Sequence, residues 1–286
     1  MNYFEKISLG TAQFGMDYGA NNHRGKIPYR ECFEILENAK SKGILQIDTA
    51  PSYGNAEKVL GSFRDIQEFK ITTKYSDIQK CPIKSLEESL DRLRVDQVEC
   101  LMFHSFQSFI ENRNIIDKFV SAKSKNLCKK IGFSLYSPEE LIFLIKEKVP
   151  VDTVQVPYSI FDQRFENIMH SAREKEIEVC TRSAFLQGIV FKDLEDLHPR
   201  FSKVKLGMES INQISDFLSC PKSAMYLGFC MLNKNIQSTI VGVDSIDNFE
   251  QNLLFLKHLG RIRECHDILL SLSCRDEREI LPTMWN

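Results

Sequence analysis

Apolar stretches of strand length alternate with amphipathic stretches of helical length along most of the chain. Eight apolar runs are predicted to form β-strands, namely residues 6–10, 44–48, 69–73, 98–103, 129–133, 152–156, 177–181 and 237–241. Between them, apolar residues at helical spacing predict helices over 28–42, 137–147, 163–175 and 246–257. The helix over 137–147 has its own start signal, since Ser137 is a candidate N-cap and Glu140 completes a capping box.

Regular alternation of strand and helix without a break in composition predicts a parallel sheet covered by helices. Eight such units predict an α/β fold, a (β/α)8 TIM barrel that forms one domain over residues 1–286. An open doubly wound sheet is the alternative, but it usually carries a G-x-G-x-x-G turn after its first strand, and none is present. Residues 182–207 are predicted to form a long loop after the seventh strand, on the catalytic face, and 261–286 a C-terminal extension with a helix over 262–273.

Composition and charge narrow the class of protein. Hydrophobic residues make up 43% and charged residues 27%, which is ordinary for a soluble globular chain. The net charge of −2 gives no electrostatic footprint for nucleic acid or an anionic membrane. No apolar run is long enough to span a bilayer, and the N-terminus has no signal-peptide pattern, so a cytoplasmic protein is expected.

The nine cysteines are scattered, and none forms a C-x-x-C pair. Buried free thiols in a reducing compartment are expected, with disulfides or metal ligands as the alternative. Cys265 and His266 are adjacent on a predicted helix and therefore point in different directions, so we expect no metal site there.

Four residues of chemical interest lie at or just after the ends of predicted strands: Asp48, Tyr53, Lys74 and His104. The carboxyl ends of the strands are where α/β barrels build their active sites. These are the residue types that a carbonyl reductase needs to deliver one proton near neutral pH. A phenol has an ordinary pKa of about 10, and we expect an ammonium to lower it, a carboxylate to fix the ammonium and an imidazole to orient or relay the proton.

The segments around these residues resemble the signature strings of the aldo-keto reductases. DTAPSYGNAEKVLG (48–61) resembles the family's DTA-x-x-YG-x-x-E-x-x-x-G. ITTK (71–74) and LMFHS (101–105) resemble the strands that carry the family lysine and histidine. IGFSLYSPEEL (131–141) and VQVPYSIFDQR (154–164) resemble two further family strings. The matches occur in family order over most of the chain, and the GTAQFG and RSAFLQG segments resemble a bacterial branch.

The resemblance implies an enzyme that binds NADPH or NADH across the top of the barrel, with Tyr53 as proton donor. Ser134 and Gln155 would bind the carboxamide, and Leu135 replaces the family asparagine. Arg182 stands where an aromatic residue usually stacks on the nicotinamide. The other residues that match the family's cofactor site are Ser183, Leu186, Gln187, Gly188, Gly242, Asp244, Asn248, Gln251 and Asn252.

The residues at the adenosine end leave the choice of dinucleotide open. Asp244 and Asn248 stand where family members carry cations that clamp a 2′-phosphate. A carboxylate accepts a ribose 2′-hydroxyl and repels a 2′-phosphate. The resemblance taken alone favours NADPH, whereas these residues predict that NADH competes with it. Asp244 as a simple helix cap is the alternative.

The expected reaction is reduction of an aldehyde or ketone, or its reverse. A substrate pocket is predicted from Gln13, Phe14, Tyr18, Phe106, Phe161 and Trp285, and a carbohydrate-derived carbonyl is the expectation for this branch. Two other functions stay open from the sequence. One is a regulatory barrel that binds nucleotide with little turnover, and the other is a lyase or isomerase that uses Lys74 as a Schiff-base amine.

Overall fold

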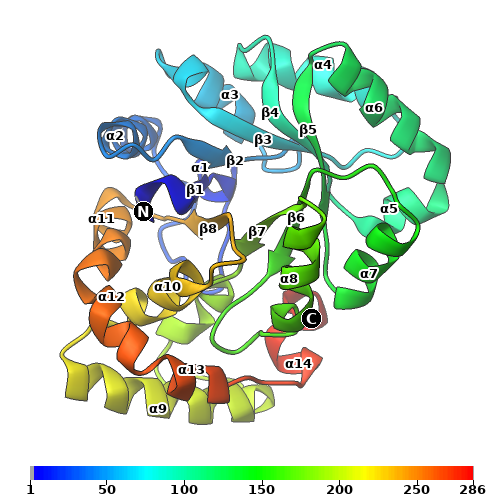
Figure 1. Ribbon diagram of the computed structural model, residues 1–286. Helices are drawn as coiled ribbons and strands as arrows, with labels where there is room; N and C mark the ends of the chain where they lie inside the picture. The colour runs from blue at the N-terminus through cyan, green and yellow to red at the C-terminus, as the bar shows by residue number, and fades with distance from the viewer. Residues whose placement is uncertain (1–2, 286) are drawn as a thin grey trace.

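Eight parallel strands close into a barrel in the computed structural model, which describes residues 3–285 (Figure 1). Each strand pairs with the next one in the chain, and β8 pairs with β1 to complete the ring. The strands are β1 (Ile7–Gly10), β2 (Gln46–Asp48), β3 (Lys70–Tyr75), β4 (Val98–Phe103), β5 (Cys128–Ser134), β6 (Thr153–Pro157), β7 (Glu178–Arg182) and β8 (Ser238–Gly242). The predicted (β/α)8 barrel is therefore confirmed, and the open sheet is excluded by the β1–β8 pairing.

Helices surround the barrel (Figure 1). The α-helices are α1 (Ala12–Gly15), α2 (Tyr29–Ser41), α3 (Ala56–Gly61), α4 (Pro82–Leu93), α5 (Phe106–Glu111), α6 (Ile116–Ser124), α7 (Pro138–Lys146), α8 (Glu166–Glu174), α9 (Ser202–Leu218), α10 (Lys222–Leu232), α11 (Ile246–Leu253), α12 (Phe255–Glu264), α13 (His266–Ser271) and α14 (Glu277–Ile280). Short 3-10 helices span Tyr3–Lys6, Ile66–Glu68, Arg113–Ile115, Leu186–Phe191, Pro199–Phe201 and Pro282–Met284. The capping box of α7 is present, and the Glu140 carboxylate accepts the Ser137 N–H at 3.1 Å.

Three predicted boundaries were wrong. The helix predicted over 246–257 is divided at Leu254, which separates α11 from α12. The helix predicted over 262–273 is interrupted at Cys265, which separates α12 from α13. The predicted loop 182–207 ends earlier than expected, because α9 begins at Ser202. Gly207, which punctuates the sequence like a loop residue, lies inside α9, and a Cβ there would come within 2.4 Å of the Phe161 ring. The glycine therefore marks a close packing contact and not the end of a helix.

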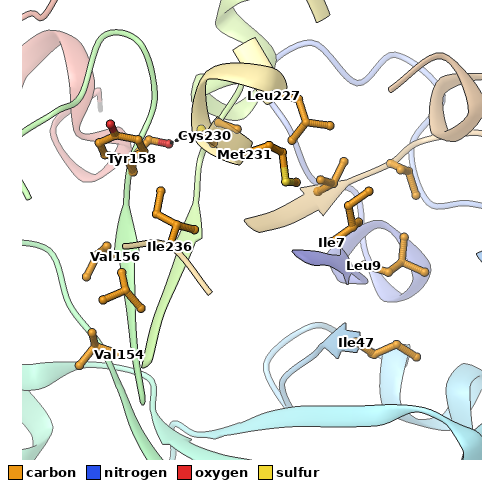
Figure 2. Close-up of a cluster of buried hydrophobic side chains, with 14 of the residues drawn as sticks. Ile7, Leu9, Ile47, Val154, Val156, Tyr158, Leu227, Cys230, Met231 and Ile236 are labelled. Carbon is orange, nitrogen blue, oxygen red and sulfur yellow. Dashed lines mark hydrogen bonds between the residues drawn. The ribbon is translucent and has the colours of Figure 1, made fainter. Parts of the chain in front are cut away.

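The hydrophobic core lies between the outer wall of the barrel and the helices. Successive strand residues point to opposite faces, so Ile7 and Leu9 of β1 point outward. Figure 2 shows them in a buried cluster with Leu227 and Met231 of α10. The inner wall carries polar side chains instead. Below Asp48 a chamber of about 110 Å³ has a lining that includes Ser8, Thr72, Cys100 and Thr153.

All nine cysteines are free thiols. Cys81 is exposed, Cys180 is partly accessible, and the others are buried. No group of three or more His, Cys, Asp or Glu side chains within residues 3–285 is arranged to hold a metal ion. Over the same residues, no helix is both long and apolar enough to cross a bilayer.

Candidate active site

The carboxyl ends of three neighbouring strands bring the four predicted catalytic residues together. Asp48 is the last residue of β2, Lys74 lies near the end of β3, and His104 directly follows β4. Tyr53 lies in the turn between β2 and α3, and its ring centroid is 5.9 Å from that of His104. Asp48, Tyr53 and His104 line one cavity, and Lys74 is buried beneath it.

Lys74 is a fully buried cation whose three ammonium protons each have an acceptor. Its Nζ donates to Asp48 Oδ2 at 2.6 Å, to the Thr49 carbonyl at 3.0 Å and to Tyr53 Oη at 3.2 Å. The other Asp48 oxygen accepts Gln155 Nε2 at 2.7 Å. A buried charge needs such a complete set of partners, and this one fixes the ammonium beside the phenol oxygen.

The Tyr53 turn is held against α1 by contact between backbones. A Cβ on Gly15 would lie 1.8 Å from the Tyr53 carbonyl oxygen, so only glycine allows this approach. Gly54 follows with a φ of +58°, in the left-handed region that favours glycine. On the far side of the turn, the buried Glu57 accepts the Thr73 hydroxyl at 2.6 Å, which ties α3 to the strand that carries Lys74.

Burial and charge set the protonation states of the site. Burial raises the pKa of Tyr53 above its ordinary value, and the Lys74 ammonium opposes that rise. The expectation that the neighbouring ammonium lowers the phenol pKa is therefore wrong for the net direction, because desolvation outweighs it. Tyr53 is a neutral phenol at pH 7 and carries a proton that it can donate.

The pKa values of Lys74 and His104 are shifted in opposite directions. Burial alone would lower the pKa of Lys74, but the Asp48 carboxylate and the Tyr53 oxygen raise it above its ordinary value, so Lys74 is an ammonium. Burial, with help from Lys74 and Arg182, lowers the pKa of His104 to about 3. His104 is therefore a neutral imidazole, which can donate one hydrogen bond and is not an acid at pH 7.

The cavity has a volume of about 800 Å³ and runs from Tyr53 and His104 to the start of α11. This is within the range of roughly 300–1,000 Å³ of small-molecule sites. Most residues predicted to bind the dinucleotide line it: Ser134, Gln155, Arg182, Ser183, Gln187, Gly188, Gly242, Asp244, Asn248, Gln251 and Asn252. Leu186 does not, because its side chain is fully buried in the core. The many amide, hydroxyl and backbone groups fit a long polar ligand such as a nicotinamide dinucleotide.

Arg182 and its neighbours form the wall of the cavity near His104. The Arg182 guanidinium lies 4.3 Å from the centre of the Tyr136 ring and donates to the Leu135 carbonyl at 3.1 Å. The Leu135 side chain is fully buried and points away from the cavity. Arg182 and Tyr136 line the cavity, whereas the Leu135 side chain does not.

The structure corrects most of the predicted substrate pocket. Gln13 and Tyr18 line the cavity. Phe14 and Phe161 are fully buried in the core, because α1 and the contact with Gly207 turn them inward. Phe106 packs on Phe109 and Phe143, and Trp285 packs on Phe201, so neither lines the cavity. Asn286, the last residue of the predicted extension, lies outside the described residues.

Several cavity residues escaped the sequence analysis. They include Asn21, Asn22, Tyr136, Phe185, Phe191, Ser223, Pro282 and Thr283. Lys222 lines the cavity as well. Asn21 and Asn22 lie in the loop after β1, which meets the loop after β7 where the Ala20 N–H donates to the Gln187 carbonyl at 2.8 Å. The two adjacent asparagines in a loop at the carboxyl end of a strand were the sequence signal that could have predicted a ligand contact there.

A protonated phenol beside a fixed ammonium lies at the top of a closed (β/α)8 barrel, in a cavity with many polar groups, and this arrangement fits a barrel oxidoreductase. Comparison with known families agrees. The model of the aldo/keto reductase family matches residues 6–265, and the chain belongs to this family. It is an NAD(P)H-dependent oxidoreductase.

Individual relatives are distant in sequence. L-galactose dehydrogenase of Arabidopsis thaliana is 23% identical over 88% of this chain and 84% of its own length. The NADH-specific methylglyoxal reductase of Escherichia coli is 22% identical over 88% of this chain and 89% of its own length. The holo structure of an aldo-keto reductase from Bacillus halodurans superposes with a TM-score of 0.76 at 18% identity, covering 96% of this chain and 95% of the other, which supports the fold.

Proposed function

We propose that this protein reduces a small aldehyde or ketone to an alcohol, and catalyses the reverse reaction, with Tyr53 as the proton donor. The observation that carries the proposal is the contact of 3.2 Å between the Lys74 ammonium and the Tyr53 hydroxyl, with Asp48 at 2.6 Å behind the ammonium. The bound dinucleotide supplies a hydride to the carbonyl carbon.

The residues of the site explain where the proton on the product alcohol comes from. As the carbonyl carbon gains the hydride, its oxygen becomes basic and takes the proton of the Tyr53 hydroxyl. The phenolate that remains lies beside the Lys74 ammonium, which stabilises the negative charge. The neutral His104 imidazole donates a hydrogen bond to the carbonyl oxygen and orients it toward Tyr53. Tyr53 regains a proton from solvent after the alcohol leaves.

The state of Lys74 argues against a Schiff-base mechanism. A nucleophilic lysine must be neutral, and its pKa is usually lowered by burial without a counter-ion. Here Asp48 raises the Lys74 pKa, and all three ammonium protons are bound by neighbours. Lys74 is therefore placed to act on Tyr53 and not on a substrate carbonyl.

Tyr53→Phe tests the proton donor. We expect kcat/KM to fall by ~10²–10⁴, the usual contribution of general acid catalysis, while the Kd for the reduced dinucleotide, from nicotinamide fluorescence, stays within about threefold. Tyr18→Phe, which removes another hydroxyl from the same cavity, is the matched control and should cost less than about tenfold. A Tyr53→Phe enzyme with activity close to wild type would refute the role of Tyr53.

We further propose that the substrate is polar and of the kind derived from sugars. The support is a cavity whose lining includes Gln13 and Tyr18, together with the similarity to an L-galactose dehydrogenase. A panel of aldoses, short aldehydes and aromatic aldehydes, compared by kcat/KM, tests this. A preference for unsubstituted aromatic aldehydes over every hydroxylated compound would reject it.

A further inference from the structure

An ion pair lies directly behind Asp244, one of the residues that line the cavity. Arg24, in the loop after β1, donates to both oxygens of Glu31 on α2, at 3.0 and 2.9 Å. The same guanidinium donates to the Asp244 carbonyl at 2.8 Å. Glu31 also accepts the backbone N–H of Ile246, the first residue of α11, at 3.1 Å. Glu31 thus joins α2, the β1 loop and the loop after β8.

This ion pair borders the adenosine end of the dinucleotide site. If hydride is delivered beside Tyr53, the nicotinamide end lies there, and the other end of the ligand reaches the opposite end of the cavity. That end is lined by Asp244, Asn248, Gln251 and Asn252. Arg24 contacts two lining residues directly, through the Asp244 carbonyl and through its own N–H to Asn22 Oδ1 at 3.0 Å.

The charges at this end disfavour a further anion. Arg24 and an N–H at the start of a helix are the groups that proteins use to bind a phosphate. Both are already bound by Glu31, which is only 16% exposed. Asp244 and Asp247 add two carboxylates near Arg24. The Glu31 pKa is held low, with the Arg24 hydrogen bond as the main cause, so Glu31 stays ionised at neutral pH.

We propose that Glu31 occupies the place of a 2′-phosphate beside Arg24 and the start of α11, and so selects the dinucleotide without that phosphate, NAD(H). The inference rests on the proposed function only for the orientation of the ligand, with its nicotinamide end at Tyr53. Glu31 is a specificity-determining residue that lies outside the segments matching the family's cofactor-binding strings.

Glu31→Gln tests the proposal, because it keeps the shape of the side chain and removes its charge. Wild-type protein should bind NADH at least tenfold more tightly than NADPH, measured as Kd by nicotinamide fluorescence. In Glu31→Gln, we expect NADPH binding to tighten at least tenfold while the Kd for NADH stays within about threefold. Adding Arg24→Met to Glu31→Gln should abolish the gain, since the phosphate then has no guanidinium to bind.

Glu34→Gln is the matched control, because Glu34 lies one turn along α2 and pairs with the exposed Arg30 at 3.1 Å. It removes the same charge without freeing Arg24 and should leave the ratio of the two Kd values unchanged. A wild-type preference for NADPH, an equal effect of Glu31→Gln on both dinucleotides, or an equal effect of Glu34→Gln would each overturn the proposal. A change in the ratio with Lys222→Met but not with Glu31→Gln would place phosphate recognition on α10 and also overturn it.

A second measurement separates this inference from the proposed function. Calorimetric titration with ADP-ribose and with its 2′-phosphate uses ligands that lack nicotinamide and cannot transfer hydride. Wild-type protein should bind ADP-ribose more tightly than its 2′-phosphate, and Glu31→Gln should lose this preference. If Tyr53→Phe retained full activity while these titrations behaved as expected, the assignment of the proton donor would fail and the role of Glu31 would stand.

Discussion

The side chains of the active site are held in fixed charge states by their surroundings. The Lys74 ammonium is stabilised by Asp48, and the Tyr53 phenol is kept protonated by burial. Burial makes the Tyr53 phenol harder to ionise, and the Lys74 ammonium opposes this effect. In the proposed reaction, Lys74 forms an ion pair with the phenolate that arises as Tyr53 gives up its proton, and this pair is absent from the ground state. The stabilisation is thus stronger in the transition state than before it, which is the condition for raising kcat.

His104 couples the site to the stability of the whole fold at acid pH. Its pKa falls from 6.5 to about 3 on folding, so between these values the unfolded chain binds a proton that the folded chain does not. The contribution of His104 to the free energy of unfolding is therefore fully present above pH 6.5 and is lost as the pH falls toward 3. For one group the loss is up to about 1.4 kcal/mol per pH unit.

Urea unfolding of wild type and His104→Asn at pH 7.0 and 5.5 measures this contribution. Wild type should lose more free energy of unfolding between these two pH values than the variant does, by about 1 kcal/mol. Other groups titrate equally in both proteins and cancel in the difference. Identical losses in the two proteins would show that folding does not lower the His104 pKa.

At the scale of elements, the position of Tyr53 depends on the contact between α1 and the turn that precedes α3. Gly15→Ala places a methyl group where a Cβ lies 1.8 Å from the Tyr53 carbonyl and 2.4 Å from the Ala56 nitrogen. The turn must move, and we expect a loss of about 1–3 kcal/mol in stability. A shift of about 1 Å in the reacting group can lower kcat by ~10².

Gly260→Ala is the control, since nothing lies within 4 Å of the added Cβ and the residue is inside α12. It should keep wild-type activity and raise stability by up to about 1 kcal/mol, because alanine favours the helix. Thermal unfolding and kcat, measured on Gly15→Ala and Gly260→Ala, test both expectations. If Gly15→Ala retained wild-type activity, the turn would be free to adjust without moving the phenol.

The elements also show what sequence patterns could and could not predict. The strands and the positions of Asp48, Lys74 and His104 follow from apolar runs of strand length that alternate with helical stretches and from short motifs, which are local signals. Phe14 and Phe161 were misassigned because the direction of an aromatic side chain in a loop or short helix depends on what packs against it. The contact between Arg24 and Asp244 joins residues 220 apart in sequence, and no local pattern encodes it.

At the scale of the whole molecule, the barrel and its helices protect most of the thiols. Burial raises the pKa of several of them, such as Cys180 and Cys230, both to about 12, which disfavours the reactive thiolate. Cys81 is the exposed one. Ellman's reagent at pH 8 should therefore titrate one thiol rapidly in the native protein and nine after unfolding without reductant.

Cys81→Ser should remove the rapid phase and leave eight thiols in the unfolded protein. Fewer than nine thiols in unfolded wild type, without reductant, would reveal a disulfide and contradict the structure. Two or more rapid thiols in native protein would show that reagent reaches the interior of the barrel through the chamber beside Cys180.

The two faces of the barrel strands have different physical roles. Outward residues such as Leu9 and Val156 bury apolar surface against the helices, so their replacement costs folding free energy. Inward residues, such as Asp48 of β2 and Gln155 of β6, form the polar interior and contribute little to that apolar core. Buried hydrogen bonds join Asp48, Lys74 and Gln155, so replacing one of them leaves a buried charge without its partner. New substrates are therefore more readily acquired by changing the loops that follow the strands, which leaves both faces of each strand intact.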